Sequence, residues 1–545
     1  MARLLTPNML DAKTPPDVNV QPDAREPVID PTLGIAVNVN KQGTPRHRLV
    51  TIGDSLTHGF QSGAIFNTRL SYPNIIAREM GWNQLRYPTY AGPGDGLPIN
   101  LEHLARQIEQ KFGVNLDWWE FPSFLSFVRN YLDEVEDYWE RNAGSIPPDP
   151  KRPINHNLAV YGWDLRNTLS RTAQICQRVL EENPSSDDYL RQVVEYHNER
   201  AAIRVLNSAR DANGKALTPL QAAAALGAEG TQETNNGDGI ETLIVLIGAN
   251  NALGSVLTFK VVWSDTGYDD MAINDRYTVW RPTHFQAELD RVVAEVKQIR
   301  ARHVIFGTVP HVTIAPFARG INKDLEGKKA AAGSRYFPFY TLPWISDEEF
   351  NPNKHPHLTG QEVRAIDSAI DQYNDSITEA VRSSRSEGRD WYVFETAGLL
   401  DRLASRRYIE DPLARPHWWE KVGGDYKLPP ALQKLSPVPN SRFFRSGSNG
   451  RTDGGLFSLD GIHPTTIGYG IMAQELIKIM QLAGVKFYQS DGAERIGEVK
   501  VNFERLIAED TLISKPPRSL SSAVDLIGTI DKNFNIFSSM LKGSY

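Results

Sequence analysis

The chain of 545 residues is long enough for a large hydrophobic core and for one or more domains. Its content of 40% hydrophobic and 23% charged residues is typical of a water-soluble globular protein. The net charge of −7, without a dense basic cluster, argues against nucleic acid as a partner. The single cysteine, Cys176, excludes an internal disulfide and a cysteine-rich metal site.

The first residues contain no apolar segment of the kind found in a secretory signal. No apolar run approaches the roughly 18 residues that a transmembrane helix needs. These observations predict a cytoplasmic protein without a transmembrane segment.

Composition divides the chain into three parts. Residues 1–45, rich in Pro, Asp and Asn, predict an extended arm. Residues 46–490 predict one domain, and residues 491–545 a C-terminal extension. Irregular stretches interrupt the domain as insertions near 83–153, 183–238, 311–358 and 405–457.

Short apolar runs alternate with amphipathic patterns along the domain. The expected strands are 49–52, 155–161, 242–247, 303–310 and 391–396. The expected helices are 71–80, 124–141, 167–182, 282–302, a helix capped by Thr359, 471–482 and an amphipathic helix at 520–541. This alternation predicts an α/β fold with a parallel sheet covered by helices.

Small or chemically active residues follow four of the apolar runs. Ser55 follows the first, Gly162 the second and Asn250 the third, and Asp460 with His463 precedes a late helix. Because the carboxyl ends of parallel strands meet at one edge of the sheet, we expect these residues to converge.

Acyl transfer needs this set of groups. Ser55 is the candidate nucleophile, His463 the candidate base and Asp460 its orienting carboxylate. The candidate oxyanion donors are the N–H groups of Ser55 and Gly162 and the side-chain amide of Asn250.

These motifs, in this order, resemble the SGNH/GDSL hydrolase (esterase and lipase) superfamily. The matching residues are Gly53-Asp54-Ser55, Asn157 to Gly162, Gly248-Ala249-Asn250-Asn251 and Asp460-Gly461-Ile462-His463. The resemblance implies a flavodoxin-like three-layer α/β/α fold. It also implies ester hydrolysis through an acyl-serine intermediate, with no cofactor and no metal.

The chain departs from the family pattern in three ways. Asn251 stands where the family usually has an aspartate that braces the loop. Tyr161 and Trp163 flank Gly162 with bulky rings, which we expect to narrow the acyl pocket. The gap between the first two motifs is also unusually long.

Several alternatives stay open. The aromatic stretch 118–127 predicts either a packed subdomain core or a wall of the acyl site, and the helix at 520–541 either docks on the domain or forms a dimer seam. His58 is expected to be a pocket or surface residue, and a metal at His355 and His357 lacks a recognisable third ligand. The substrate is a small-molecule, lipid or carbohydrate ester. The competing function is a catalytically weak or inactive hydrolase fold that serves as a binding or interaction protein.

Overall fold

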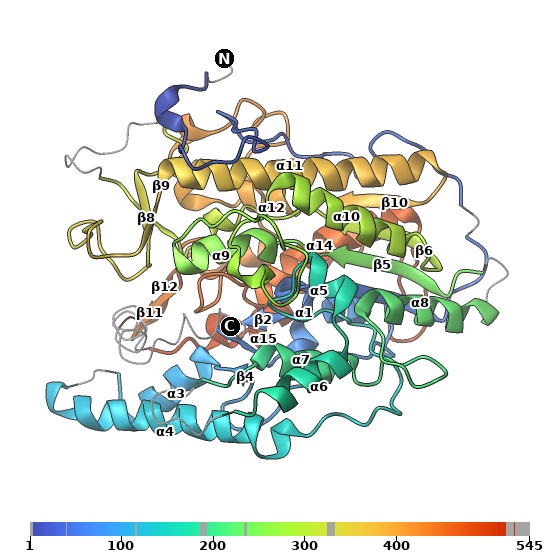
Figure 1. The fold of residues 1–545 in the computed structure, drawn as a ribbon, viewed down its shortest axis with the longest axis horizontal. Coiled ribbons are helices and arrows are strands. Elements are labelled where there is room, and N and C mark those ends of the chain that lie inside the picture. The colour runs from blue at the N-terminus through green and yellow to red at the C-terminus, as the bar shows by residue number, and fades with distance from the viewer. Residues whose placement is uncertain are drawn as a thin grey trace.

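The computed structural model describes residues 4–39, 41–114, 117–185, 193–233, 237–323, 333–518 and 528. A four-stranded parallel sheet in the order β1-β5-β6-β10 forms the centre of the molecule (Figure 1). Its strands are β1 (His47–Gly53), β5 (Ile240–Leu246), β6 (Ala301–Gly307) and β10 (Trp391–Phe394). Every residue of β1 and β5 is buried, as expected of parallel strands that are covered on both faces.

The expected strand at 155–161 is an extended segment that lies parallel to β1 through a single bridge, between Thr51 and Asn157. The Thr51 N–H donates to the carbonyl oxygen of His156 at 2.9 Å, and the Leu158 N–H donates to that of Thr51 at 2.9 Å. The segment therefore occupies the position beside β1, on the side opposite to β5.

Helices cover both faces of the sheet, because alternate strand residues point to opposite sides. Leu243 and Val245 of β5 belong to the core that packs against α8 (Pro219–Glu229), α10 (Pro282–Val296) and α11 (Gly360–Ser386). The intervening β5 residues face α2 (Tyr72–Glu79) and α14 (Thr466–Ala483). Figure 1 shows α10 and α11 on the near side of the sheet. The expected parallel α/β architecture is confirmed.

The other elements decorate this core. The remaining helices are α1 (Ser55–His58), α3 (Leu101–Phe112), α4 (Phe121–Glu140), α5 (Leu165–Ser170), α6 (Ala173–Glu182), α7 (His197–Leu206), α9 (Asn250–Thr258), α12 (Thr396–Asp401), α13 (Pro430–Gln433), α15 (Phe503–Glu509) and α16 (Thr511–Ser514). Small antiparallel sheets are formed by β2 (Phe60–Gln61), β3 (Ala64–Ile65) and β4 (Leu97–Pro98), by β7 (Arg319–Ile321), β8 (Phe339–Thr341) and β9 (His357–Thr359), and by β11 (Arg445–Gly447) and β12 (Gly450–Asp453).

Three helices differ from the expectation. The helix expected at 282–302 ends at Val296, because residues 301 and 302 already belong to β6. The single helix expected at 167–182 is two helices, because the chain turns extended at Arg171 and restarts with Thr172 as the cap of α6. The helix expected at 471–482 begins earlier, directly after Thr465, whose hydroxyl accepts from the Gly468 N–H. The amphipathic helix expected at 520–541 lies outside the described residues, apart from position 528.

The described part of residues 1–45 lies along α11 and β10. Val18 and Ala24 are buried against the domain. Arg25 forms ion pairs with Asp375 at 2.7 Å and with Glu395 at 3.1 Å. The Val393 N–H of β10 donates to the Pro31 carbonyl oxygen at 3.1 Å. Buried side chains, ion pairs and a backbone hydrogen bond thus hold this segment to the edge of the sheet.

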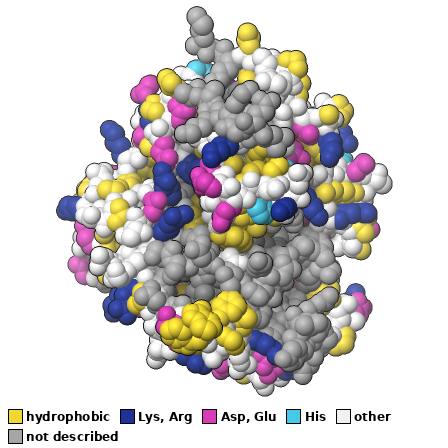
Figure 2. Space-filling view, turned by 90° about the vertical axis from the view of Figure 1, so that its left-hand side faces the viewer, with side chains coloured by type: hydrophobic (Ala, Val, Ile, Leu, Met, Phe, Trp, Pro, Cys, Tyr) yellow, Lys and Arg dark blue, Asp and Glu magenta, His cyan; other side chains and the backbone are white. Residues whose placement is uncertain are grey.

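Figure 2 shows the face that carries β8, β9, β11 and β12, where acidic and basic side chains are interspersed rather than gathered into a field of one sign. Within the ranges given above, no helix is both long enough and apolar enough to cross a membrane. No group of three His, Cys, Asp or Glu side chains that could hold a metal ion occurs among those residues either.

We predict that Ile244→Ala in β5 lowers the free energy of unfolding by about 3 kcal/mol, because the side chain is fully buried between the strands and α14. The measurement is the shift of the urea unfolding midpoint. The control Ile175→Ala, on the exposed side of α6, should cost about 1 kcal/mol or less. Equal losses in the two variants would contradict this description of the core.

Candidate active site

Ser55 lies at the carboxyl end of β1, where the chain turns sharply into α1. The Asp54 side chain caps this turn by accepting the Leu56 N–H at 3.0 Å. A Cβ on Gly53 would lie 2.2 Å from Thr57 Oγ1 and 2.5 Å from the Leu246 carbonyl oxygen. Only glycine allows β1 to approach the turn and β5 so closely, and this approach holds Ser55 at the edge of the sheet.

His463 connects Ser55 to Asp460. Its Nε2 lies 2.8 Å from Ser55 Oγ, and its Nδ1 lies 3.0 Å from Asp460 Oδ2. Ser55 is 6% exposed, His463 4% and Asp460 0%. The structure thus brings these three residues together, although Ser55 and His463 are 408 positions apart.

Asp460 has several hydrogen-bond donors besides the imidazole. Its Oδ1 accepts the N–H groups of Ile462 and His463, both at 2.8 Å, and its Oδ2 accepts the Gly63 N–H at 3.0 Å. Burial by itself would raise the pKa of Asp460, but His463 and the backbone donors outweigh it and hold this pKa below its usual value. An ionised Asp460 favours the tautomer with the proton on Nδ1, which leaves Nε2 to accept the Ser55 proton.

The candidate oxyanion donors follow neighbouring strands of the sheet: Ser55 follows β1, Asn250 follows β5, and Gly162 follows the segment bridged to β1. Among the described residues, the N–H groups of Ser55 and Gly162 have no hydrogen-bond acceptor. Gly162 has a φ of +79°, and a Cβ there would lie 2.3 Å from Asn198 Nδ2. Asn250 Nδ2 donates to the Trp163 carbonyl oxygen at 2.8 Å, which leaves its second amide hydrogen for another acceptor.

Asn157 and His58 support this arrangement in ways that sequence reasoning missed. Asn157 Nδ2 donates to the Thr57 carbonyl oxygen at 3.0 Å and so ties the second motif to α1. His58 is fully buried, which excludes the expected surface position. Its Nδ1 accepts the Tyr161 N–H at 3.2 Å, and its Nε2 lies 2.9 Å from the Tyr90 hydroxyl. The only signal in the sequence was the position of Asn157 at the start of the second motif.

The departures from the family pattern have structural counterparts. Asn251 Oδ1 accepts the Leu165 N–H at 3.4 Å, so an amide oxygen braces the loop where the family usually has a carboxylate. Neither Tyr161 nor Trp163 lines the apolar pocket beside Ser55, so the narrowing expected of them does not occur there. The Tyr161 ring stacks on His197, with ring centres 5.6 Å apart.

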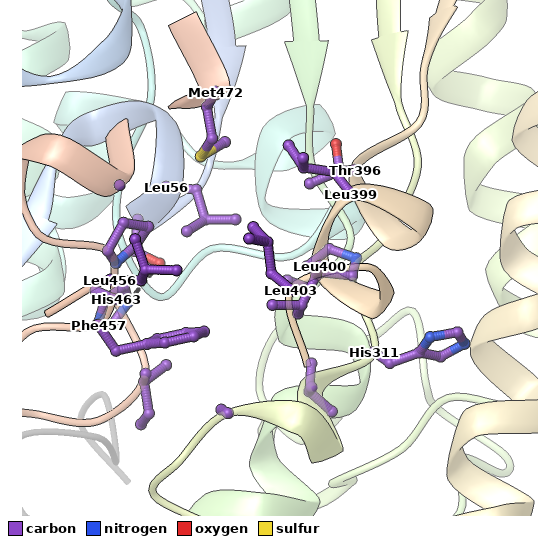
Figure 3. Close-up of a pocket in the computed structure, with 18 of the residues that line it drawn as sticks. Leu56, His311, Thr396, Leu399, Leu400, Leu403, Leu456, Phe457, His463 and Met472 are labelled. Atoms are coloured by element: carbon purple, nitrogen blue, oxygen red, sulfur yellow. Dashed lines mark hydrogen bonds between the residues drawn. The ribbon is translucent and has the colours of Figure 1, made fainter. Parts of the chain in front are cut away.

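The apolar pocket extends from Ser55 and His463 between α9, α12 and α14 (Figure 3). It is a partly open pocket, in which about 880 Å³ is free of protein atoms when the solvent at its mouth is included. Its apolar walls are formed by Leu56, Ala249, Leu253, Pro310, Val312, Ala315, Leu399, Leu400, Leu403, Leu456, Phe457, Ile462, Pro464, Gly468, Ile471 and Met472.

The aromatic stretch 118–127 does not line this pocket. Phe124 is buried in the core, whereas Trp118 is 84% and Trp119 61% exposed. The stretch is therefore a partly packed helix start and does not form a wall of the apolar pocket. His355 and His357 also lie outside the pocket, and His357 Nδ1 is 3.0 Å from the His355 carbonyl oxygen.

A scan against protein-family models found no match, and a search of the curated proteins found none either.

Buried His58 makes stability depend on pH. Burial lowers the pKa of His58 to about 3, below the value of about 6.5 expected in the unfolded chain. The unfolded chain therefore binds a proton that the folded chain does not, and stability is lost as the pH falls below about 6.5. Between pH 7 and pH 5 we expect His58 to account for a loss of about 2 kcal/mol.

The measurement is chemical unfolding of the native protein and of His58→Asn at both pH values. The asparagine can accept the Tyr161 N–H but does not titrate, so His58→Asn should lose about 2 kcal/mol less than the native protein. The same loss in both proteins would show that His58 is not held neutral.

Proposed function

We propose that this chain is a serine hydrolase of the SGNH/GDSL type that cleaves carboxylic esters. The observation that carries the proposal is the hydrogen-bonded chain from Ser55 Oγ through His463 to Asp460. Within the described part of the chain, the N–H groups of Ser55 and Gly162 also have no acceptor. A nucleophile, a base, an oriented carboxylate and donors for an oxyanion are the groups that acyl transfer requires.

In the first step, Ser55 Oγ bonds to the ester carbonyl carbon while its proton moves to His463 Nε2. The carbonyl oxygen becomes an oxyanion that accepts from the N–H groups of Ser55 and Gly162 and from Asn250 Nδ2. Asp460 stabilises the imidazolium that forms. As the bond to the alcohol oxygen breaks, His463 returns the proton to that oxygen, and an acyl-serine remains.

In the second step, water takes the place of the alcohol. His463 removes a proton from the water as its oxygen bonds to the acyl carbon, and then returns the proton to Ser55 Oγ. The carboxylic acid leaves and the enzyme is restored. The proposed reaction uses no cofactor and no metal.

The order of the sheet supports a flavodoxin-like arrangement as part of this proposal. The segment at 156–160 lies beside β1, and β5, β6 and β10 follow on the other side of β1. Numbered along the chain, this order is 2-1-3-4-5, as in flavodoxin-like folds, where ligands bind at the carboxyl edge next to the first strand. Ser55 lies at that edge of β1.

The proposal keeps the domain boundaries at residues 45 and 490. It also keeps a C-terminal helix that either docks on the domain or forms a dimer seam. The substrate belongs to the small-molecule, lipid or carbohydrate esters.

We predict that a fluorophosphonate probe labels the native protein at Ser55 and that Ser55→Ala abolishes both labelling and hydrolysis of p-nitrophenyl butyrate. The variant should keep the native circular dichroism spectrum, because the change removes only one oxygen atom. Mass spectrometry of the labelled peptide identifies the residue.

Ser123→Ala, at an exposed position of α4, is the matched control and should be labelled like the native protein. A folded native protein that is neither labelled nor active would support the competing function, a binding protein on an inactive hydrolase fold.

We predict that Asn250→Ala lowers kcat for the same ester by about 100-fold to 1,000-fold with little change in KM, because the amide binds the transition state more strongly than the ester. Steady-state kinetics measures both constants. Asn213→Ala, at an exposed turn, serves as the control. A rise in KM at constant kcat would show that Asn250 binds the substrate rather than the oxyanion.

A further inference from the structure

The apolar pocket beside Ser55 offers a ligand almost no hydrogen bonds. Among the described residues that line it, only Ser55, His311, Thr396 and His463 have polar side chains, and none is a carboxylate, lysine or arginine. Ser55 and His463 lie at the end where the chemistry is proposed. The rest of the pocket is suited to a hydrocarbon chain.

His311 does not change this description. Its Nδ1 is 2.9 Å from Asp401 and its Nε2 is 2.9 Å from Asp371, so both ring nitrogens are engaged outside the pocket. Burial by itself would lower the pKa of His311, but the two carboxylates outweigh it and raise this pKa well above its usual value. The ring therefore lines the pocket without directing an N–H into it. Figure 3 shows the His311 ring at the margin of the pocket, away from Leu400 and Leu403.

The other side of the candidate site is polar. A second pocket is lined by two of the three candidate oxyanion residues, Gly162 and Asn250, and by charged side chains that include Arg171 and Asp275. Gly162 itself is exposed to solvent. The neighbours Ala249 and Asn250 thus face different environments, one apolar and one polar.

We propose that the apolar pocket binds the acyl chain of the substrate and that the protein prefers esters of fatty acids over acetate esters. This proposal rests on the function proposed above. The acyl group stays bonded to Ser55 between the two chemical steps, so an apolar pocket beside Ser55 suits it. The alcohol must leave and water must enter, and the polar, exposed side at Gly162 suits that exchange.

The pocket makes the rate depend on acyl length. Each methylene that enters the pocket should raise kcat/KM by about fourfold, because burying a methylene group is favourable. This gain should stop when the pocket is full. The test compares kcat/KM for p-nitrophenyl octanoate and p-nitrophenyl acetate. In the native protein we expect a ratio of about tenfold or more in favour of octanoate.

Leu403 directs its side chain into the middle of the pocket (Figure 3). Leu403→Trp should fill this space and lower the octanoate-to-acetate ratio by about tenfold or more, whereas Leu403→Ala should enlarge the space and move the preferred acyl chain beyond octanoate. Leu482→Trp carries the same substitution on the exposed side of α14, outside the pocket, and should leave the ratio unchanged. If Leu403→Trp does not fold, Leu403→Ala still tests the proposal.

A second measurement separates failure of the pocket from failure of the reaction. Ser55→Ala should bind a dansyl-labelled fatty acid, octanoate should displace it, and adding Leu403→Trp should abolish binding. If native protein cleaves no ester but this binding pattern holds, the proposed reaction is wrong and the pocket assignment stands. An unchanged ratio in both Leu403 variants, or fatty-acid binding that ignores Leu403→Trp, would overturn the pocket assignment.

Discussion

The carboxylate of Asp460 is the constraint on which the site depends. It is fully buried, and burying a carboxylate is costly unless donors surround it. Two of its donors are backbone N–H groups within its own turn, and a third is the Gly63 N–H between β2 and β3. One ionised group therefore joins the turn that carries His463 to the hairpin that follows Ser55. Without it, the imidazole would lose both its orientation and its fixed distance from the serine.

The parts of the site that sequence reasoning could predict are those at the ends of strands. Ser55 and Asn250 each follow an apolar run after two intervening residues, and parallel strands bring their carboxyl ends to a common edge. Asp460 and His463 are three positions apart, so a single turn fixes their relation. Local patterns of this kind are visible in one sequence because no distant residue is needed to interpret them.

Other parts depend on contacts between distant segments and carry no local signal. The hydrogen bond from the Tyr161 N–H to His58 joins residues 103 positions apart, and no local sequence pattern near either residue predicts it. Leu399, Leu400 and Leu403 look in the sequence like ordinary core residues, yet they line a pocket. The aromatic stretch 118–127, which was expected to form a core or a pocket wall, leaves Trp118 and Trp119 exposed. Apolar composition indicates that a side chain avoids water, but not whether protein or empty space lies beside it.

The N-terminal segment has a consequence for association between molecules. β10 is the last strand of the central sheet, and an uncovered last strand presents free backbone groups to any other extended chain. Pro31 accepts a hydrogen bond from Val393, and Arg25 fastens the same segment through Glu395, immediately beyond the strand. The proline has no N–H of its own to continue a ladder outward. The segment thus ends the sheet at β10, and cleavage that released it would turn a closed border into a surface on which copies of the protein can stack strand to strand.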